Sequence, residues 1–172
     1  MEKMEVQKAE ISDLEIIKNI GRLTFFETFA EVNTEADMNT YLDKSFSDEK
    51  LKEELLDPNS EFYFVLDDEK VIGYLKINFG SSQTEQKDKN SLEIERIYVL
   101  KEYHGKKVGQ VLYDCALKIA KEKQVEFVWL GVWEKNPRAI SFYTKNGFEA
   151  FDKHVFVLGT DEQTDIMMKL TL

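Results

Sequence analysis

Residues 97–110 combine glycines and lysines at the point where an apolar run, typical of a strand, passes into helical spacing. Gly105 and Gly109 would let a ligand approach the backbone closely, and a helix N-terminus offers unpaired N–H groups. Lys101, Lys106 and Lys107 add positive charge, so the segment is suited to a phosphate or pyrophosphate. The Walker A and Rossmann patterns are absent, and an ordinary turn between a strand and a helix is the alternative.

The elements that must position this segment follow from hydrophobic periodicity. Helical spacing and capping residues predict helices after Asp13, Thr34 and Ser47, and over 107–123 and 137–145. The polar segment 80–90 is expected to be a mobile loop between strands. Apolar and β-branched runs predict strands over 6–10, 62–66, 71–79, 92–100, 126–133, 148–158 and 163–170.

The chain has 172 residues, 42% of them hydrophobic, which predicts one domain over 1–172. A single cysteine excludes an internal disulfide, and with only His104 and His154, far apart, no metal site is expected. His154, with no acid at catalytic spacing, is interpreted as structural. No apolar run approaches the ~18 residues of a membrane span, and residues 1–5 lack the apolar region of a signal peptide. A cytoplasmic protein without a membrane partner is expected.

The formal net charge is −10, which argues against nucleic acid as a partner, because binding its phosphates requires a surplus of Lys and Arg. The negative charge is concentrated in residues 27–69, which contain fourteen acids and three bases and carry −11. The rest of the chain has 20 bases and 19 acids, a net charge of +1. The acidic segment is either a solvated face of surface helices or an acidic wall near a cation site.

Residues 95–110 resemble motif A of the GCN5-related N-acetyltransferase (GNAT) family, whose pyrophosphate loop reads Gln/Arg-x-x-Gly-x-Gly/Ala. In this chain the last glycine matches, whereas His104 and Lys107 depart from the pattern. Roughly 30 residues further on, motif B is matched by Asn136, Ala139, Phe142-Tyr143 and Gly147-Phe148. Residues 92–98, 129–136 and 163–165 are also similar to the PaiA-type bacterial spermidine/spermine N-acetyltransferases, so the similarity covers nearly the whole chain.

The resemblance implies an α/β (α+β) GNAT fold, in which helices flank a mixed, mostly antiparallel, six- to seven-stranded sheet. Its central strands, 92–100 and 126–133, would run parallel and splay apart. The resemblance also implies acetyl-CoA as cosubstrate, with the backbone of 97–99 along the pantetheine arm and the amides of 105–110 on the pyrophosphate. The implied cofactor-binding residues are Ile97, Tyr98, Val99, Gly105, Lys106, Lys107, Val108, Gly109, Gln110 and Asn136.

Acetyl transfer to an amine needs a group that removes a proton, because an alkylamine with a pKa of about 10.4 arrives protonated at pH 7. Glu95 is the candidate base, since it immediately precedes the cofactor-binding part of its strand, and Glu93 is the alternative. Strict alternation along 92–100 would place both on one face and Arg96 and Tyr98 on the other. Tyr143 occupies the position of the family's general acid, with a packed core aromatic as the alternative.

The acceptor in this family lies between the first helices and the cofactor strand. Spermidine is a flexible polycation, which carboxylates and aromatic faces suit. Cys115 lies on the apolar stripe of the predicted helix 107–123, so direct attack in a ternary complex is expected rather than an acyl-cysteine. Dimers are common in the family, so a homodimer is compatible with the resemblance. The implied substrate-binding residues are Phe26, Glu27, Glu31, Tyr41 and Trp133.

The favoured function is acetyl-CoA-dependent transfer of an acetyl group to a primary amine of spermidine or spermine. One alternative is a GNAT enzyme for another amine, such as a protein N-terminus or an aminosugar. The other is a catalytically silent acyl-CoA-binding regulatory module. The presence of both Glu95 and Tyr143 counts against the module, and the acidic segment favours a cationic acceptor over an acidic peptide.

Overall fold

The computed structural model of the chain describes residues 4–86 and 89–172. Two parts of the chain lie outside the described residues: 1–3, from the N-terminal segment in which no signal peptide is expected, and 87–88, from the predicted loop. The α-helices of the described part are α1 (Leu14–Phe29), α2 (Glu35–Ser45), α3 (Asp48–Leu56), α4 (Val108–Glu122) and α5 (Pro137–Lys145). The strands are β1 (Met4–Lys8), β2 (Ser60–Asp67), β3 (Lys70–Phe79), β4 (Ser91–Val99), β5 (Phe127–Trp133), β6 (Glu149–Leu158) and β7 (Asp161–Thr171).

Three helices begin at polar residues whose side chains cap the first turn, as the sequence predicted. Thr34 accepts a hydrogen bond from the backbone N–H of the third helical residue of α2, and Ser47 does the same for α3. Asn136 caps α5, in which Pro137 occupies the first turn. These caps satisfy N–H groups that a helix leaves unpaired, so they fix where each helix starts.

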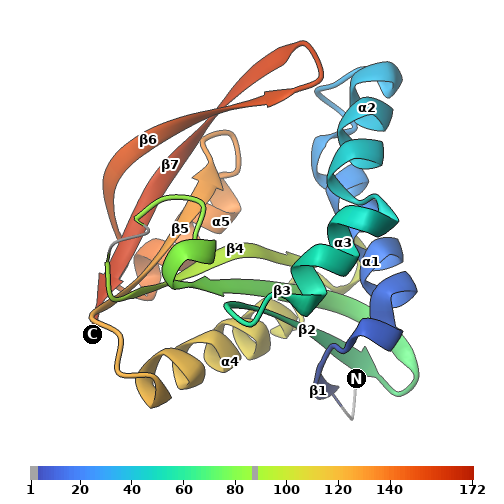
Figure 1. Cartoon of the computed structure of the whole chain (residues 1–172). Coiled ribbons are helices and arrows are strands. Elements are labelled where there is room, and N and C mark those ends of the chain that lie inside the picture. Colours follow the sequence, from blue (N-terminus) through green and yellow to red (C-terminus); the bar gives the residue numbers. More distant parts are fainter. Residues whose placement is uncertain (1–3, 87–88) are drawn as a thin grey trace.

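The strands form one mixed sheet in the order β1-β2-β3-β4-β5-β7-β6 (Figure 1). All neighbouring strands are antiparallel except β4 and β5, which are parallel. Their ladder joins only 91–94 to 127–130, although β4 continues to Val99 and β5 to Trp133. The two central strands therefore splay apart and leave facing edges unpaired. The predicted GNAT fold, with parallel and splayed central strands, is confirmed.

A β-bulge interrupts β4 where the two strands begin to separate. Lys76 pairs with Arg96 and the next residue of β3, Ile77, pairs with Ile94, so Glu95 is the extra residue of the bulge. The strict alternation predicted along 92–100 is therefore wrong, because a bulge shifts the side chains that follow it to the other face. Arg96 and Tyr98 face the same cavity as the two glutamates.

The helices cover the sheet on different sides (Figure 1). Helix α4 packs against β2, β3 and β4, and α1 packs against β3 and β4 with α3 beside it. Helix α2 faces the β6–β7 hairpin, where the Asp37 carboxylate accepts hydrogen bonds from the backbone N–H and the hydroxyl of Thr160. This contact joins the acidic helices to the far end of the sheet. Within the described residues, none of the helices is both long and apolar enough to cross a membrane.

Candidate active site between strands β4 and β5

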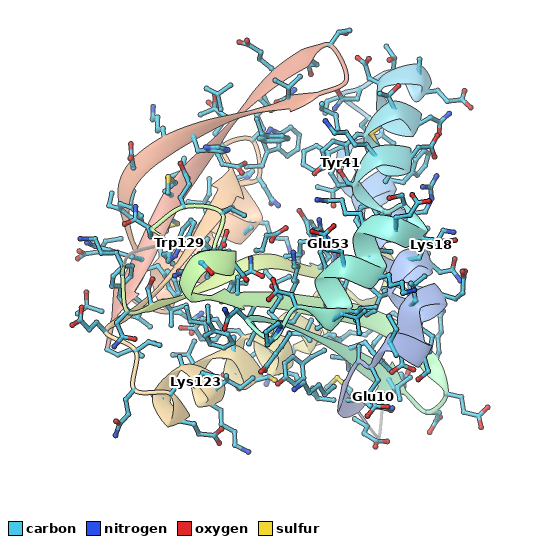
Figure 2. All side chains as sticks on the ribbon, in the orientation of Figure 1. Glu10, Lys18, Tyr41, Glu53, Lys123 and Trp129 are labelled. Atoms are coloured by element: carbon cyan, nitrogen blue, oxygen red, sulfur yellow. The ribbon has the colours of Figure 1, made fainter. Side chains whose placement is uncertain are left out.

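A cavity of about 240 Å³ lies beside the point where β4 and β5 diverge. Helices α1 and α2 form one wall, and β5, β6 and β7 form the other; Figure 2 shows Tyr41 directed from α2 into the space between them. Its aromatic lining is Phe25, Phe29, Tyr41, Phe46, Tyr74, Tyr98, Trp129, Trp133 and Phe156. Its polar lining is Thr84, Glu85, Glu93, Glu95, Arg96, His154 and Asp165.

The aromatic rings connect elements that are distant in the sequence. Phe25 stacks on Tyr41 with ring centroids 4.4 Å apart, and Phe29 lies 4.6 Å from Trp133. Phe29 also meets the edge of Phe156 at 6.1 Å. Phe25 and Phe29 are buried, so they belong both to the core and to the cavity wall. The rings bring π faces together around a space that also contains carboxylates, and such faces attract cations.

Glu95 is held as a carboxylate by neighbours on two strands. Lys76 Nζ lies 2.8 Å from it, Asn78 Nδ2 donates a hydrogen bond at 2.8 Å, and Arg96 lies 3.4 Å away. Glu54 of α3 approaches the same two cations, at 3.2 Å from Lys76 and 3.6 Å from Arg96. Burial acts to raise the pKa of Glu95, but Arg96 and Lys76 outweigh it and hold the pKa at about 2.

Glu93 lies beside Glu95 in a different electrostatic environment. It accepts hydrogen bonds from the backbone N–H and the hydroxyl of Thr84, and from Asn78 at 3.0 Å. Burial raises its pKa, although these hydrogen bonds act in the opposite direction. One amide, that of Asn78, therefore bridges two carboxylates whose pKa values are shifted in opposite directions, an arrangement typical of acid–base sites.

The segment after β3 supplies Thr84 to this site because it is anchored to the sheet. Gln83 is buried, and its Oε1 accepts hydrogen bonds from Trp129 Nε1 and from Ser91 Oγ, both at 2.7 Å. Residues 80–82 form a 3₁₀ turn. Residues 80–86 are thus anchored to the sheet, which differs from the predicted mobile loop. A buried glutamine within a polar sequence ties them to β4 and β5, a contact that their composition does not reveal.

The sequence analysis missed five polar side chains of the cavity as site residues: Thr84, Glu85, Arg96, His154 and Asp165. His154 Nδ1 lies 3.6 Å from the Glu85 carboxylate, and His154 is paired with Asp165 across β6 and β7. The interpretation that His154 has no acid partner is therefore wrong, because its neighbours come from distant parts of the chain. Gly131, a lone glycine in an apolar strand, was the available signal, since such a glycine marks close approach by another group.

The predicted phosphate-binding segment forms the turn before α4. Gly105 and Lys107 both have positive φ, of 78° and 65°, and α4 begins at Val108 without a side-chain cap. A Cβ added at Gly105 or Gly109 would meet nothing within 4 Å, so the backbone there is open to a ligand. The Lys106 N–H already donates to a carbonyl within the turn, at 3.3 Å. The turn thus presents uncapped helix N–H groups to solvent, as anion binding requires.

Ile97, Tyr98 and Val99 pair with β3 on one side and face the opening between the strands on the other. Their backbone edge toward β5 carries no ladder partner, so an extended ligand arm has room to pair there. His104 Nε2 lies 2.9 Å from the Val99 carbonyl oxygen. His104, one of the two residues that depart from the family loop pattern, therefore contacts the strand expected to hold the pantetheine arm.

Several predicted site residues lie outside the cavity lining. Tyr143 is buried in an aromatic cluster, with ring centroids 5.4 Å from Phe142 and 5.6 Å from Phe148, and burial raises its pKa. Phe26 and Glu31 are exposed on the surface. Glu27 and Asn136 are engaged elsewhere: Glu27 accepts a hydrogen bond from the Lys101 N–H at 3.0 Å, and Asn136 caps α5. Of the five predicted substrate-binding residues, Tyr41 and Trp133 line the cavity.

Comparisons with known proteins agree with the fold. Residues 25–148 match the acetyltransferase (GNAT) family. An uncharacterized N-acetyltransferase of Lactobacillus delbrueckii subsp. lactis is 40% identical over 172 residues, covering 100% of this chain and 99% of the relative. A spermidine N(1)-acetyltransferase of Thermoplasma acidophilum is 30% identical over 153 residues, covering 87% and 90%.

Among solved structures, the PaiA N-acetyltransferase of Thermoplasma acidophilum in complex with coenzyme A superimposes with a TM-score of 0.81. It is 27% identical, and the match covers 99% of both chains. The family match spans the splayed strands β4 and β5, the turn before α4, and α5, whereas β6 and β7, which complete the cavity wall, follow the matched residues. The chain therefore belongs to the acetyltransferase (GNAT) family and is an N-acetyltransferase by fold and sequence.

Proposed function

We propose that the protein transfers an acetyl group from acetyl-CoA to a primary amine of a polyamine such as spermidine or spermine. The observation that carries this proposal is the cavity beside β4, where four carboxylates and one arginine share a space walled by aromatic rings. Carboxylates pair with ammonium groups, and π faces and apolar surface suit the methylene spacers between them. The similarity to a spermidine N(1)-acetyltransferase supports this choice of acceptor.

The chain offers two surfaces that fit acetyl-CoA. The unpaired edge of Ile97–Val99 suits the pantetheine arm, and the open turn at Gly105 and Gly109 suits the pyrophosphate. Two acids beside the turn are already engaged, since Glu102 forms an ion pair with Lys70 and Glu27 accepts a hydrogen bond from the Lys101 N–H. In this arrangement the thioester enters between β4 and β5, where backbone N–H groups near Val99 stabilise negative charge on its oxygen.

Glu95 is ionised throughout the physiological pH range. With its pKa at about 2 and that of an alkylamine near 10.4, direct and complete proton transfer to Glu95 would cost roughly 11 kcal/mol. We therefore assign Glu95 the role of a fixed negative charge that orients the amine through water while the proton leaves to solvent. Glu93, whose pKa is raised, is the alternative to solvent as the group that accepts the proton of the amine.

Tyr143 is the proposed proton donor for the leaving thiolate. Burial keeps its hydroxyl protonated at neutral pH, which a general acid requires. Cys115 is half-buried on α4, burial raises the pKa of its thiol, and it lies outside the cavity lining. These facts support direct attack by the amine in a ternary complex rather than a covalent acyl-enzyme.

The proposal is tested by measuring thiol release from acetyl-CoA with a panel of amines. The panel contains spermidine, spermine, putrescine, a peptide with a free N-terminus, a lysine peptide and an aminoglycoside. We expect the highest kcat/KM with a polyamine. Exclusive activity toward the peptides or the aminoglycoside would assign the enzyme to another amine. Tight binding of acetyl-CoA without thiol release from any amine would favour the regulatory module.

A further inference from the structure

The wall of the cavity opposite the two glutamates contains a carboxylate that the proposed chemistry does not use. Asp165 lies on β7 and lines the cavity beside Trp133, its partner across β5 and β7. Among the described residues, no hydrogen bond or ion pair engages its side chain within the usual distances. A partly buried carboxylate without a partner is costly unless a cation or donor reaches it.

The fold makes room for this carboxylate at a glycine. A Cβ built on Gly131 would lie 3.2 Å from Asp165 Oδ2 and 3.5 Å from Asp165 Cβ. Gly131 is the only residue of β5 without a side chain, and β5 is otherwise bulky and apolar. The Asp165 carboxylate therefore lies over bare backbone and faces the cavity.

The groups around Asp165 leave its charge largely uncompensated. His154 of β6 is its cross-strand partner and acts to lower its pKa, but burial dominates and raises the pKa to about 6. Glu85, from the segment after β3, contributes a second negative charge at 3.6 Å from His154. Tyr98 of β4 lines the same cavity, and the Asp165 carboxylate is among the groups that raise the pKa of its hydroxyl. Near neutral pH this end of the cavity is therefore acidic.

The two acidic ends of the cavity lie on different strands. Glu93 and Glu95 are on β4, and Asp165 is on β7, with β5 between them. Adjacent strands are about 4.8 Å apart, so two steps across the sheet separate these backbones by roughly 10 Å, and the splay of β4 from β5 adds to this. Aromatic rings, including Phe29, Trp133 and Tyr98, line the space between.

We propose that Asp165 binds a second ammonium group of the acceptor, so that the enzyme selects amines carrying two positive charges at a fixed spacing. This inference rests on the proposed function and adds the residue that reads the distal charge. The reacting amine lies near Glu95, the methylene chain lies along the aromatic rings, and the distal ammonium group lies at Asp165. Glu85 lies at the rim, beyond His154, where it adds to the attraction.

The test compares a diamine with a monoamine of equal chain length, diaminopentane and pentylamine, in the wild type and in Asp165→Asn. In the wild type we expect kcat/KM to favour the diamine. In Asp165→Asn we expect this preference to fall by about 30-fold, since a hydrogen bond to a charged group is worth ~2 kcal/mol. Because the preference is the ratio of kcat/KM for the diamine to kcat/KM for the monoamine, any loss of activity common to both substrates cancels. A series from diaminopropane to diaminooctane should show a chain-length optimum that the variant lacks.

Two further variants keep the result interpretable. Gly131→Ala crowds the carboxylate without removing its charge and should reduce the same preference, which covers the case in which Asp165→Asn does not fold. Glu162→Gln removes an exposed carboxylate from the same strand and should leave the preference unchanged. An unaltered preference in Asp165→Asn, or a wild type without preference, would overturn the inference alone. A wild type that acetylates neither amine nor spermidine would overturn the proposed function, and this inference with it.

Discussion

Replacing Lys76 by Met tests whether the buried ion pairs beneath the site stabilise the fold. Lys76 is 5% exposed and contacts Glu95 at 2.8 Å and Glu54 at 3.2 Å. The pKa of Glu95 falls from 4.5 to about 2, which at 1.36 kcal/mol per pKa unit corresponds to about 3 kcal/mol, shared between Lys76 and Arg96. With the contact to Glu54 added, Lys76→Met should lower the free energy of unfolding at pH 7 by ~2 kcal/mol.

The pH dependence makes this prediction specific. The pKa of Glu95 is lower in the folded state, so its contribution is present above pH 4.5 and is lost as the pH falls toward 2. The difference between the wild type and Lys76→Met should therefore shrink between pH 7 and pH 3 in urea unfolding. Lys70→Met is the matched control, because Lys70 lies on the same strand but forms an exposed pair with Glu102. Equal losses in the two variants, or a loss independent of pH, would refute the reasoning.

Three other predictions concern the contact between the β6–β7 turn and α2 and the catalytic groups. Gly159→Ala should lower the free energy of unfolding in urea by ~2 kcal/mol, and Gly105→Ala by about 1 kcal/mol. Both glycines have positive φ, but only a Cβ at Gly159 would collide with a neighbour, Asp37, at 2.3 Å. Equal losses in the two variants would contradict this reasoning. Glu95→Gln should lower kcat by about 100-fold in the thiol assay, and an unchanged kcat in a folded variant would exclude the role. Tyr143→Phe should lower kcat at least 10-fold with unchanged affinity for acetyl-CoA, and a normal kcat would contradict the assignment.

Local sequence signals predicted most of the secondary structure, because their physical causes are local. Thr34, Ser47 and Asn136 cap helices within three residues of themselves, so their effect is visible in the sequence. The run 127–133 is apolar because β5 is covered on both faces, which is typical of a central strand. The family fold and its splayed strands were predicted from the resemblance of residues 95–110 and 136–148 to the family motifs.

The site was predicted less completely, because its residues meet through the sheet order. The bulge at Glu95 depends on how β3 pairs with β4. It places Arg96 and Tyr98 in the cavity, although strict alternation of side chains along the strand predicted that they would face the other side of the sheet. Asp165 reaches the cavity because β7 pairs with β5, which follows β4 in the sheet.

In the acidic segment 27–69, the sequence showed the charge but did not show which side chains reach the cavity. Its net charge was visible in the sequence, yet Glu27 and Glu31, which were expected to meet the acceptor, lie outside the cavity, as does Phe26 just before the segment. Tyr41 does line the cavity.

The sequence by itself determined the family, the helix starts, the order of the strands along the chain and the turn suited to phosphate. These features depend on periodicity, capping and glycine, which act over a few residues. Only the tertiary structure decided which charges share the cavity and in which direction the pKa of each carboxylate is shifted. A pKa depends on burial and on neighbours a few ångströms away in space, such as Lys76 and Arg96 beside Glu95, and these distances exist only after the strands have paired.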